Sequence, residues 1–202
     1  MRSRAVVSFF LAIVFIVGGT QQLRAASASA VVGEFHDHLL GVMKEASGLS
    51  VNDRFERLSG PIDTAFDLRR MIRVAASPQW KTAAQAEQQR LFDTFRRLSI
   101  ATYAAQFDGY SGQAFKTVGE RPGPQQTILV ATKIVESGGD AVGLTYVMKK
   151  TDENWLIADV LLDDSISQLA VRRSEYRRIL KKSGIEGLVG TLSAKTDDLL
   201  ID

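Results

Sequence analysis

Three consecutive strand-like segments between residues 126 and 162 constrain the fold of this chain more than any other part of it. They span residues 127–136, 141–150 and 155–162, and each is rich in β-branched and aromatic residues. A glycine pair at 138–139 and a polar tripeptide at 152–154 separate them, as is typical of hairpin turns. The pattern therefore predicts an antiparallel meander.

The two faces of this predicted sheet are both apolar. Successive strand residues point to opposite faces, so a sheet with one solvated face shows a clean alternation, which is missing here. If both hairpin loops have even length, one face carries Ile128, Val130, Ile134, Val147, Leu156, Val160 and Leu162. The other then carries Leu129, Val135, Leu144, Tyr146, Met148, Trp155, Ile157 and Leu161. A one-residue change of register would alter the membership but not the apolar character, so both faces need a cover.

Two interpretations of this cover remain open from the residues alone. In the first, the helices of the chain seal both faces and the apolar positions are simply core. In the second, the helices close one face completely and the other incompletely, which leaves an apolar cleft for a ligand.

The first thirty residues resemble a secretory signal peptide. Arg2 and Arg4 precede an apolar run at 5–17 that is short for a membrane span, and small residues at 26–30 offer cleavage sites. An uncleaved anchor is the alternative. The sequence therefore predicts a signal peptide at 1–30 and a single domain at 31–202, soluble outside the cytoplasm.

Composition excludes several classes of function. Residues 1–30 hold three of the 25 Lys and Arg residues and none of the 23 acidic ones, so their removal changes the net charge from +2 to −1. This balance gives no reason to expect a nucleic-acid partner. The chain has no cysteine, so it has no disulfide. His36 and His38 stand two apart, which points them away from each other on a helix, and we expect no metal site.

No phosphate loop, nucleophile elbow or other catalytic motif is present in the sequence. An enzyme would therefore depend on Asp, Glu and Tyr. Asp159 is the one acid inside an apolar strand, so an isomerase-type proton abstraction by Asp159 in an apolar pocket is an alternative function.

Helical periodicity and a further strand fill the rest of the chain. Helices are expected at 31–46, 51–58, 62–76, 82–110, 166–182 and 185–200, and a first strand at 115–121. The predicted helix at 51–58 ends at Ser59-Gly60-Pro61. The helix at 166–182 carries a cationic cluster of Arg172, Arg173, Arg177, Arg178, Lys181 and Lys182, which is either a solvated face or a docking patch for an acidic partner or an anionic lipid surface.

Four segments resemble one known family over nearly the whole of residues 31–202. They are FDLRRMIR at 66–73, Trp80, LSIATYAAQFDGYSGQAF at 98–115 and WLIADVLLDDSISQLAVRRSEYRRIL at 155–180. They are similar to the MlaC family of periplasmic lipid-binding proteins, and closest to its hopanoid-associated branch, HpnM. Arg69-Arg70 and the turn at 76–78 depart from the family pattern.

The resemblance implies an α+β fold in which several helices pack on a curved antiparallel sheet of about four strands, in an NTF2-like or cystatin-like arrangement around an apolar cavity. It implies a monomeric carrier, not an enzyme, that needs no cofactor and shuttles a lipid between an inner-membrane transporter and an outer-membrane complex. Phospholipid and hopanoid both remain open as cargo, and the isomerase and a ligand-free adaptor remain the alternative functions.

A set of apolar and aromatic residues is expected to line that cavity: Phe92, Phe95, Tyr103, Ile128, Val130, Tyr146, Met148, Ile157 and Val160. Among them, Tyr103 is the best candidate to donate a hydrogen bond to a head group. Arg172, Arg173, Arg177 and Arg178 are the candidate residues for partner docking.

Overall fold

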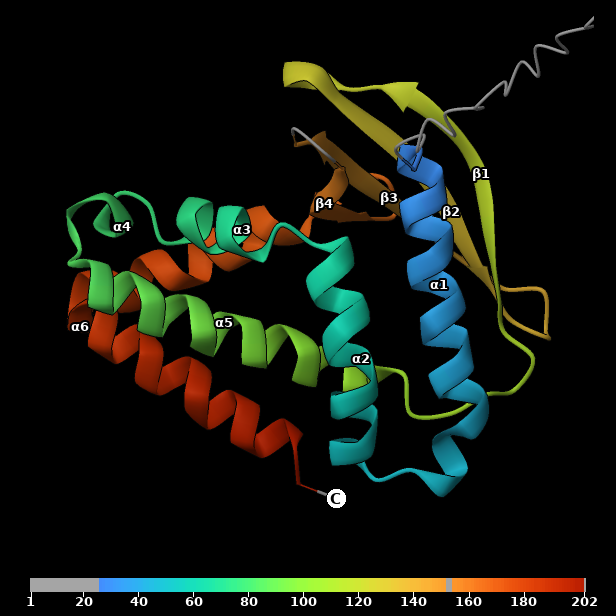
Figure 1. Cartoon of the computed structure of the whole chain (residues 1–202), viewed down its shortest axis with the longest axis horizontal. Helices are drawn as coiled ribbons and strands as arrows, with labels where there is room; N and C mark the ends of the chain where they lie inside the picture. The colour runs from blue at the N-terminus through green and yellow to red at the C-terminus, as the bar shows by residue number, and fades with distance from the viewer. Residues whose placement is uncertain (1–25, 152–153, 202) are drawn as a thin grey trace, which may run out of the picture.

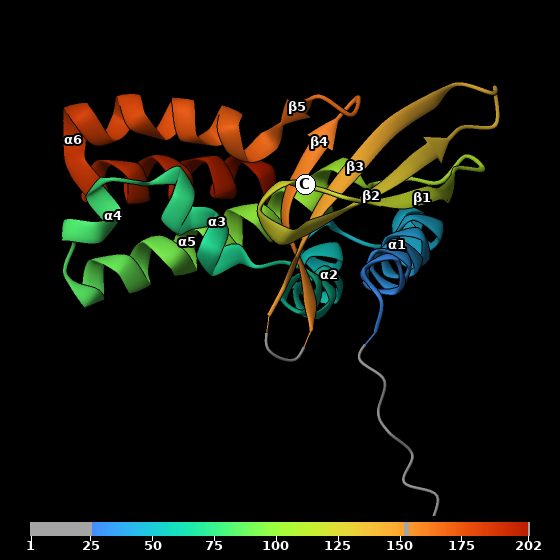
Figure 2. The same ribbon diagram turned by 90° about the horizontal axis from the view of Figure 1, so that it is seen from above.

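In the computed structural model, which describes residues 26–151 and 154–201, helices pack with an antiparallel sheet (Figures 1 and 2). The helices are α1 (Ala28–Glu45), α2 (Val51–Ala65), α3 (Leu68–Ala75), α4 (Gln79–Thr82), α5 (Gln85–Gln106) and α6 (Gln168–Leu199), with short 3-10 turns at Ala46–Gly48 and Pro124–Gln126. Helices α1 and α2 lie against one face of the sheet, and the helices α3 to α6 extend to one side of it (Figures 1 and 2). Most of the predicted signal segment falls outside the described residues, and that prediction stays untested.

The sheet has five strands in the order of the sequence, instead of the four expected. They are β1 (Ala114–Pro122), β2 (Thr127–Val135), β3 (Ala141–Lys150), β4 (Trp155–Leu162) and β5 (Ile166–Ser167), and all pair antiparallel. The predicted meander is confirmed almost to the residue. The additional strand arises because Asp163 and Asp164 adopt positive φ angles of 49° and 57° and reverse the chain at once.

The predicted division of residues between the two faces is wrong for two local reasons. The loop between β2 and β3 holds five residues, because Val135 pairs with Ala141, so the assumed even-length loop shifts the assignment by one. A bulge between β3 and β4 then places Met148 opposite Ile157 but Val147 opposite Asp159. Residues on the same face as Tyr146 are therefore Ile128, Val130, Thr132, Ile134, Val142, Leu144, Met148, Ile157, Val160 and Leu162.

This face, which we call the inner face, is the one that α1 and α2 cover (Figure 2). Val130, Met148 and Ile157 are fully buried there. The outer face is not covered by a helix, and its apolar residues Val147, Leu156 and Leu161 stay half-buried. The expectation that both faces need a cover is therefore wrong. Leu129 and Thr145 on the outer face are buried, whereas the polar residues Lys149 and Asp159 are half-exposed there, which makes contact of this face with solvent tolerable.

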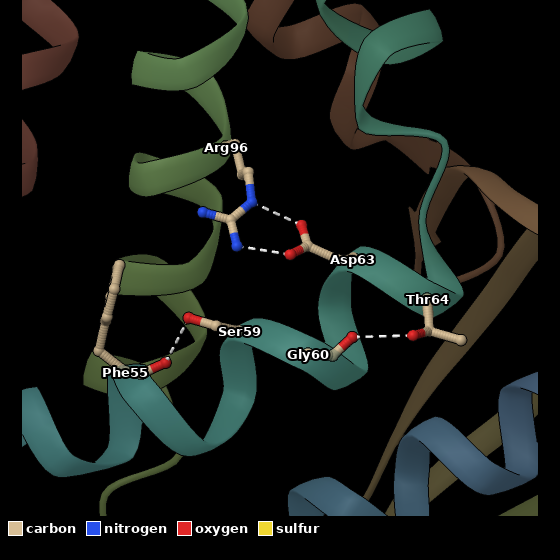
Figure 3. Close-up of polar contacts among 6 residues, drawn as sticks. All are labelled: Phe55, Ser59, Gly60, Asp63, Thr64 and Arg96. Atoms are coloured by element: carbon tan, nitrogen blue, oxygen red, sulfur yellow. Dashed lines mark hydrogen bonds and ion pairs between the residues drawn. The ribbon is translucent and has the colours of Figure 1, made fainter.

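Helix α2 runs through the predicted stop at Pro61 and ends only at Ala65. Leu58 and Ile62 flank the proline and are both fully buried, so packing of this face outweighs the lost backbone hydrogen bond. The hydroxyl of Ser59 donates to the carbonyl of Phe55 at 2.9 Å (Figure 3). Asp63 receives two hydrogen bonds from the guanidinium of Arg96 on α5, which fixes α2 beside α5 (Figure 3).

The predicted helix at 62–76 is interrupted at Phe66-Asp67. The backbone N–H of Asp67 donates to the carbonyl of Ile157 at 2.9 Å, so the chain touches β4 at this point. The Asp67 carboxylate then accepts a hydrogen bond from the backbone N–H of Arg70 and caps α3. This break places Phe66 beneath the sheet.

Helix α6 consists of two arms that turn at Gly184, as the sequence predicts. The first arm runs away from the sheet, and the second arm runs back beside the first (Figure 1). Gly184 has φ 63° and ψ −164°, a conformation that is essentially restricted to glycine. The turn therefore depends on this residue.

Replacing Gly184 with alanine is expected to lower the free energy of unfolding by about 1–3 kcal/mol, because the side chain disfavours this backbone conformation. No heavy atom lies within 4 Å of the added Cβ, so the cost comes from the backbone alone. Gly190→Ala in the second arm is the matched control, since it also meets no atom within 4 Å but has helical φ and ψ. It should stabilise by up to about 1 kcal/mol in urea unfolding. Equal effects of the two substitutions would contradict the role of Gly184.

Candidate functional site

A cavity of about 290 Å³ lies between the inner face of the sheet and the helices. Its sheet side is formed by Ile134, Val142, Leu144, Tyr146, Val160 and Leu162. Its helix side comes mainly from apolar and aromatic residues of α2, α3, α5 and the segment between α2 and α3, namely Ile62, Phe66, Leu68, Met71, Tyr103 and Phe107. Seven strand and helix segments that are distant in sequence thus converge on a mostly apolar space, which suits an apolar ligand.

Aromatic rings form the floor of the cavity. Tyr103 packs edge-on against Phe35 at 5.4 Å between ring centroids and stacks on Phe107 at 5.7 Å. Phe66 also packs edge-on against Phe35, at 5.1 Å. The helix interruption at Phe66 therefore brings α1, α2 and α5 together under the sheet. Their packed rings make the floor of the cavity rigid.

A buried histidine, His36, packs against Tyr146 on the sheet side of the cavity. Nε2 of His36 and the hydroxyl of Tyr146 share a hydrogen bond of 2.8 Å, and the imidazole stacks on Phe115 with 4.2 Å between centroids. Burial lowers the pKa of His36 from 6.5 to about 4 and raises the pKa of Tyr146 well above 10. Both groups are therefore neutral at physiological pH, and this wall carries no charge.

Tyr103 offers a polar group inside the cavity. Its hydroxyl has no hydrogen-bond partner within residues 26–151 and 154–201, yet it lines the open space. Burial raises the pKa of Tyr103 to about 12, against the opposing effect of the positive charge on Arg172. The hydroxyl is thus protonated and available as a donor to a ligand.

A second hollow, the α5–α6 groove, adjoins the cavity. It has a volume of about 710 Å³ and lies between α5 and the two arms of α6. Thr102, Gln106, Gln168 and Arg172 line both spaces. The groove also contains apolar residues such as Leu98 and Ile179. These four polar residues therefore form a boundary between two largely apolar hollows. Together the two hollows offer more space than the cavity alone.

The structure brings three of the nine predicted lining residues to the cavity wall: Tyr103, Tyr146 and Val160. Phe95, Val130, Met148 and Ile157 are buried in the core behind the wall, and Ile128 is half-buried at its edge. Phe92 packs instead under the guanidinium of Arg69, 4.2 Å from the ring centroid. The roles of all nine as lipid contacts stay predictions.

Several wall residues escaped the sequence analysis. Leu144 shares its strand face with Tyr146 but was not selected as a lining residue, whereas Leu162, which pairs with Leu144, joins this face only in the correct hairpin register. Phe107, four residues after Tyr103, follows the helical spacing of the α5 stripe and was detectable from that spacing.

The four candidate docking arginines do not form one surface. Arg173, Arg177 and Arg178 are exposed on the first arm of α6, and Arg178 borders the groove. Arg172 is half-buried, with its guanidinium 5.3 Å from the ring centroid of Phe95. None of the four pairs with a carboxylate of the described residues.

Asp159, the candidate base of an isomerase, does not line the cavity. It faces the outer side of the sheet, opposite Val147. Its carboxylate accepts hydrogen bonds from the hydroxyl of Ser167 at 2.5 Å and from the backbone N–H of Leu169 at 3.0 Å. Asp159 therefore holds the start of α6, where its negative charge also matches the helix dipole.

In the part of the chain that the structure describes, no group of three or more His, Asp or Glu residues is placed to hold a metal ion. No helix of that part is both long and apolar enough to cross a membrane.

Comparison with known proteins agrees with this architecture. The family model of the MlaC protein matches residues 34–194, so the chain belongs to the MlaC family. A solved structure of the phospholipid-binding protein from Ralstonia solanacearum, in complex with a phospholipid, superposes with a TM-score of 0.76 at 23% identity. The match covers 87% of this chain and 100% of that one, and it confirms the α+β fold. Assignment to the HpnM branch stays a prediction.

Proposed function

We propose that this protein is a lipid carrier that holds the apolar tails of one lipid beneath the sheet. The observation that carries the proposal is the apolar cavity between the inner face and the helices, which shares four lining residues with the adjoining α5–α6 groove. Membership of the MlaC family and the phospholipid bound to the R. solanacearum protein support a phospholipid as the cargo. A hopanoid is the second candidate cargo.

The dimensions favour a ligand that occupies both hollows. Small-molecule pockets usually enclose about 300–1,000 Å³. The cavity alone is at the lower end of this range, at about 290 Å³, whereas the adjoining groove adds about 710 Å³. Burial of an acyl chain contributes about 0.8 kcal/mol per methylene group. Since a bilayer offers the same burial, the exchange of lipid between carrier and membrane costs little, which suits reversible loading.

The two alternative functions fit the geometry less well. An isomerase would need an acid or base in the apolar space, and Asp159 lies on the other side of the sheet. A ligand-free adaptor would need no internal space, and a cavity of about 290 Å³ is then without a purpose. The first observation supports a binding protein over an enzyme, and the second supports a binding protein over an adaptor.

The wider cycle follows from the same proposal. After export by the segment at 1–30, the monomeric carrier works in the periplasm and exchanges lipid with an inner-membrane transporter and an outer-membrane complex. The exposed residues Arg173, Arg177 and Arg178 have no carboxylate partner among the described residues. They therefore provide a surface that acidic docking sites on those complexes can bind.

Native mass spectrometry of the protein purified from the periplasm tests the proposal. We expect one lipid per protein, released on denaturation and identifiable by its fragmentation. The expected lipid is a phospholipid, and a hopanoid would keep the carrier but change the cargo. A bare protein mass, unchanged after incubation with phospholipid vesicles, would refute the carrier and revive the adaptor.

A further inference from the structure

Arg172 occupies the boundary between the cavity and the α5–α6 groove. It lines both hollows, and it comes from the first arm of α6. Its guanidinium packs over the ring of Phe95 and has only a long hydrogen bond, 3.4 Å, from Nη1 to the hydroxyl of Ser99. Most of its donor capacity is therefore unused in the protein.

Arg172 is half-buried without a carboxylate partner, as Arg54 and Arg70 are, but of these three only Arg172 lines the cavity and the groove. Arg57, Arg90, Arg96 and Arg97 each pair with a carboxylate near the surface. Arg172 is half-buried, yet no carboxylate of the described chain pairs with it. A partly desolvated cation is costly unless an anion compensates it, so the position indicates an anion from outside the protein.

The groups around Arg172 complement an oxyanion. The free hydroxyl of Tyr103 lines the same cavity, and the charge of Arg172 acts on it directly. The amide of Gln106 lines both hollows and makes no hydrogen bond within the described residues. Along the groove, Arg178, Lys182 and Lys195 outnumber the single acid Glu175, which makes the surroundings positive.

We propose that Arg172, with Tyr103 and Gln106 as further donors, binds the phosphate group of a lipid whose tails lie in the apolar hollows. The planar guanidinium donates two parallel hydrogen bonds to phosphate oxygens, which a neutral head group cannot accept with equal strength. The carrier then selects phosphate-bearing lipids over neutral lipids with the same tails. This inference rests on the proposed function, since it names the head group of the proposed cargo.

A competition between two lipids with identical tails tests this selectivity. Full-length mature protein is incubated with vesicles of dioleoylphosphatidylglycerol that contain a known fraction of dioleoylglycerol, and native mass spectrometry gives the ratio of the two bound lipids. We expect the wild type to be enriched in the phospholipid over the vesicle composition. Arg172→Gln should lower this preference by about tenfold or more, as the loss of charge-assisted hydrogen bonds predicts.

Two further variants separate charge, geometry and folding. Lys181→Gln removes one exposed cation from the same arm of α6 and should keep the wild-type preference. Arg172→Lys keeps the charge but loses the paired donors, so its preference should fall between the wild type and Arg172→Gln. It also supplies a second measurement if Arg172→Gln does not fold.

The outcomes distinguish the inference from the carrier function. If the wild type binds neither lipid, the carrier itself is refuted and the inference with it. If the wild type and Arg172→Gln both bind the two lipids in the vesicle proportion, the carrier stands and the phosphate site is refuted. If both proteins bind the two lipids in the vesicle proportion, yet lipid-free wild type carries an inorganic phosphate adduct that Arg172→Gln lacks, the lipid origin of the anion is overturned and the site belongs to free phosphate.

Discussion

Thr102→Trp is expected to abolish stoichiometric lipid binding while the protein stays folded. Thr102 is half-exposed on α5 and lines both the cavity and the α5–α6 groove, so an indole there takes up space in both hollows. Displacement of about four methylene groups of a bound chain costs about 3 kcal/mol, or about a hundredfold in affinity. Native mass spectrometry after incubation with phospholipid vesicles should show the bare protein mass.

Thr94→Trp on the same helix is the matched control. Both threonines are half-exposed, and both donate their hydroxyl to the carbonyl four residues earlier, at 2.7 Å for Thr102 and 2.9 Å for Thr94. Thr94 lies outside the cavity and the groove, so its substitution repeats the change in helix propensity without filling either hollow. Circular dichroism checks the fold of both. Normal lipid retention in folded Thr102→Trp would show that the lipid binds elsewhere.

The sequence predicts the strands well because their signals are local. The bounds of β3 and β4 agree with the predicted segments, since β-branched runs and the turn residues between them determine both ends. The faces were assigned wrongly because they depend on loop parity and on the bulge beyond Met148, which no local pattern specifies. Pro61 is a similar case: the local rule predicts a stop, but burial of Leu58 and Ile62 decides the outcome.

The cavity was harder to predict because its wall and the adjacent core are chemically alike. Val130 and Tyr146 are direct neighbours on the inner face, yet only Tyr146 reaches the open space. Because the two residues pair across β2 and β3, periodicity gives them equivalent positions and cannot separate wall from core. Tyr103 was identified because a buried hydroxyl needs a partner, and the absence of one among the described residues is what makes it a candidate donor.

Arg172 shows a signal that the sequence analysis missed. The sequence analysis groups Arg172 with the exposed cations because Arg173 stands next to it. Consecutive helical residues, however, point in different directions. Tyr176 and Ile179 stand four and seven residues after Arg172, so the three share one side of α6 and all border the groove. A cation on an apolar helix stripe is more informative about a ligand than a cation in a run of charges.

His36→Gln is expected to remove most of the pH dependence of stability between pH 6.5 and about 4. Burial lowers the pKa of His36 from 6.5 in the unfolded chain to about 4 in the folded protein. In this window the unfolded state therefore binds more protons, so the free energy of unfolding falls as the pH falls. The contribution of neutral His36 to the free energy of unfolding is complete above pH 6.5 and is lost progressively toward about pH 4. The loss in the wild type amounts to about 3 kcal/mol.

Urea unfolding of the wild type and of two single variants at several pH values in this window measures the effect. Glutamine can still bond to the hydroxyl of Tyr146 but does not titrate, so His36→Gln loses stability at neutral pH through the lost stacking on Phe115, yet its curve against pH is flatter. His38→Gln is the matched control, because His38 is exposed on the same helix and should keep the wild-type slope. Each variant differs from the wild type at a single histidine, so the difference between the curves isolates His36. Parallel curves for the wild type and His36→Gln would mean that the pKa of His36 is the same in the folded and unfolded protein, so that His36 would gain a charge beside Tyr146 as the pH falls through this window.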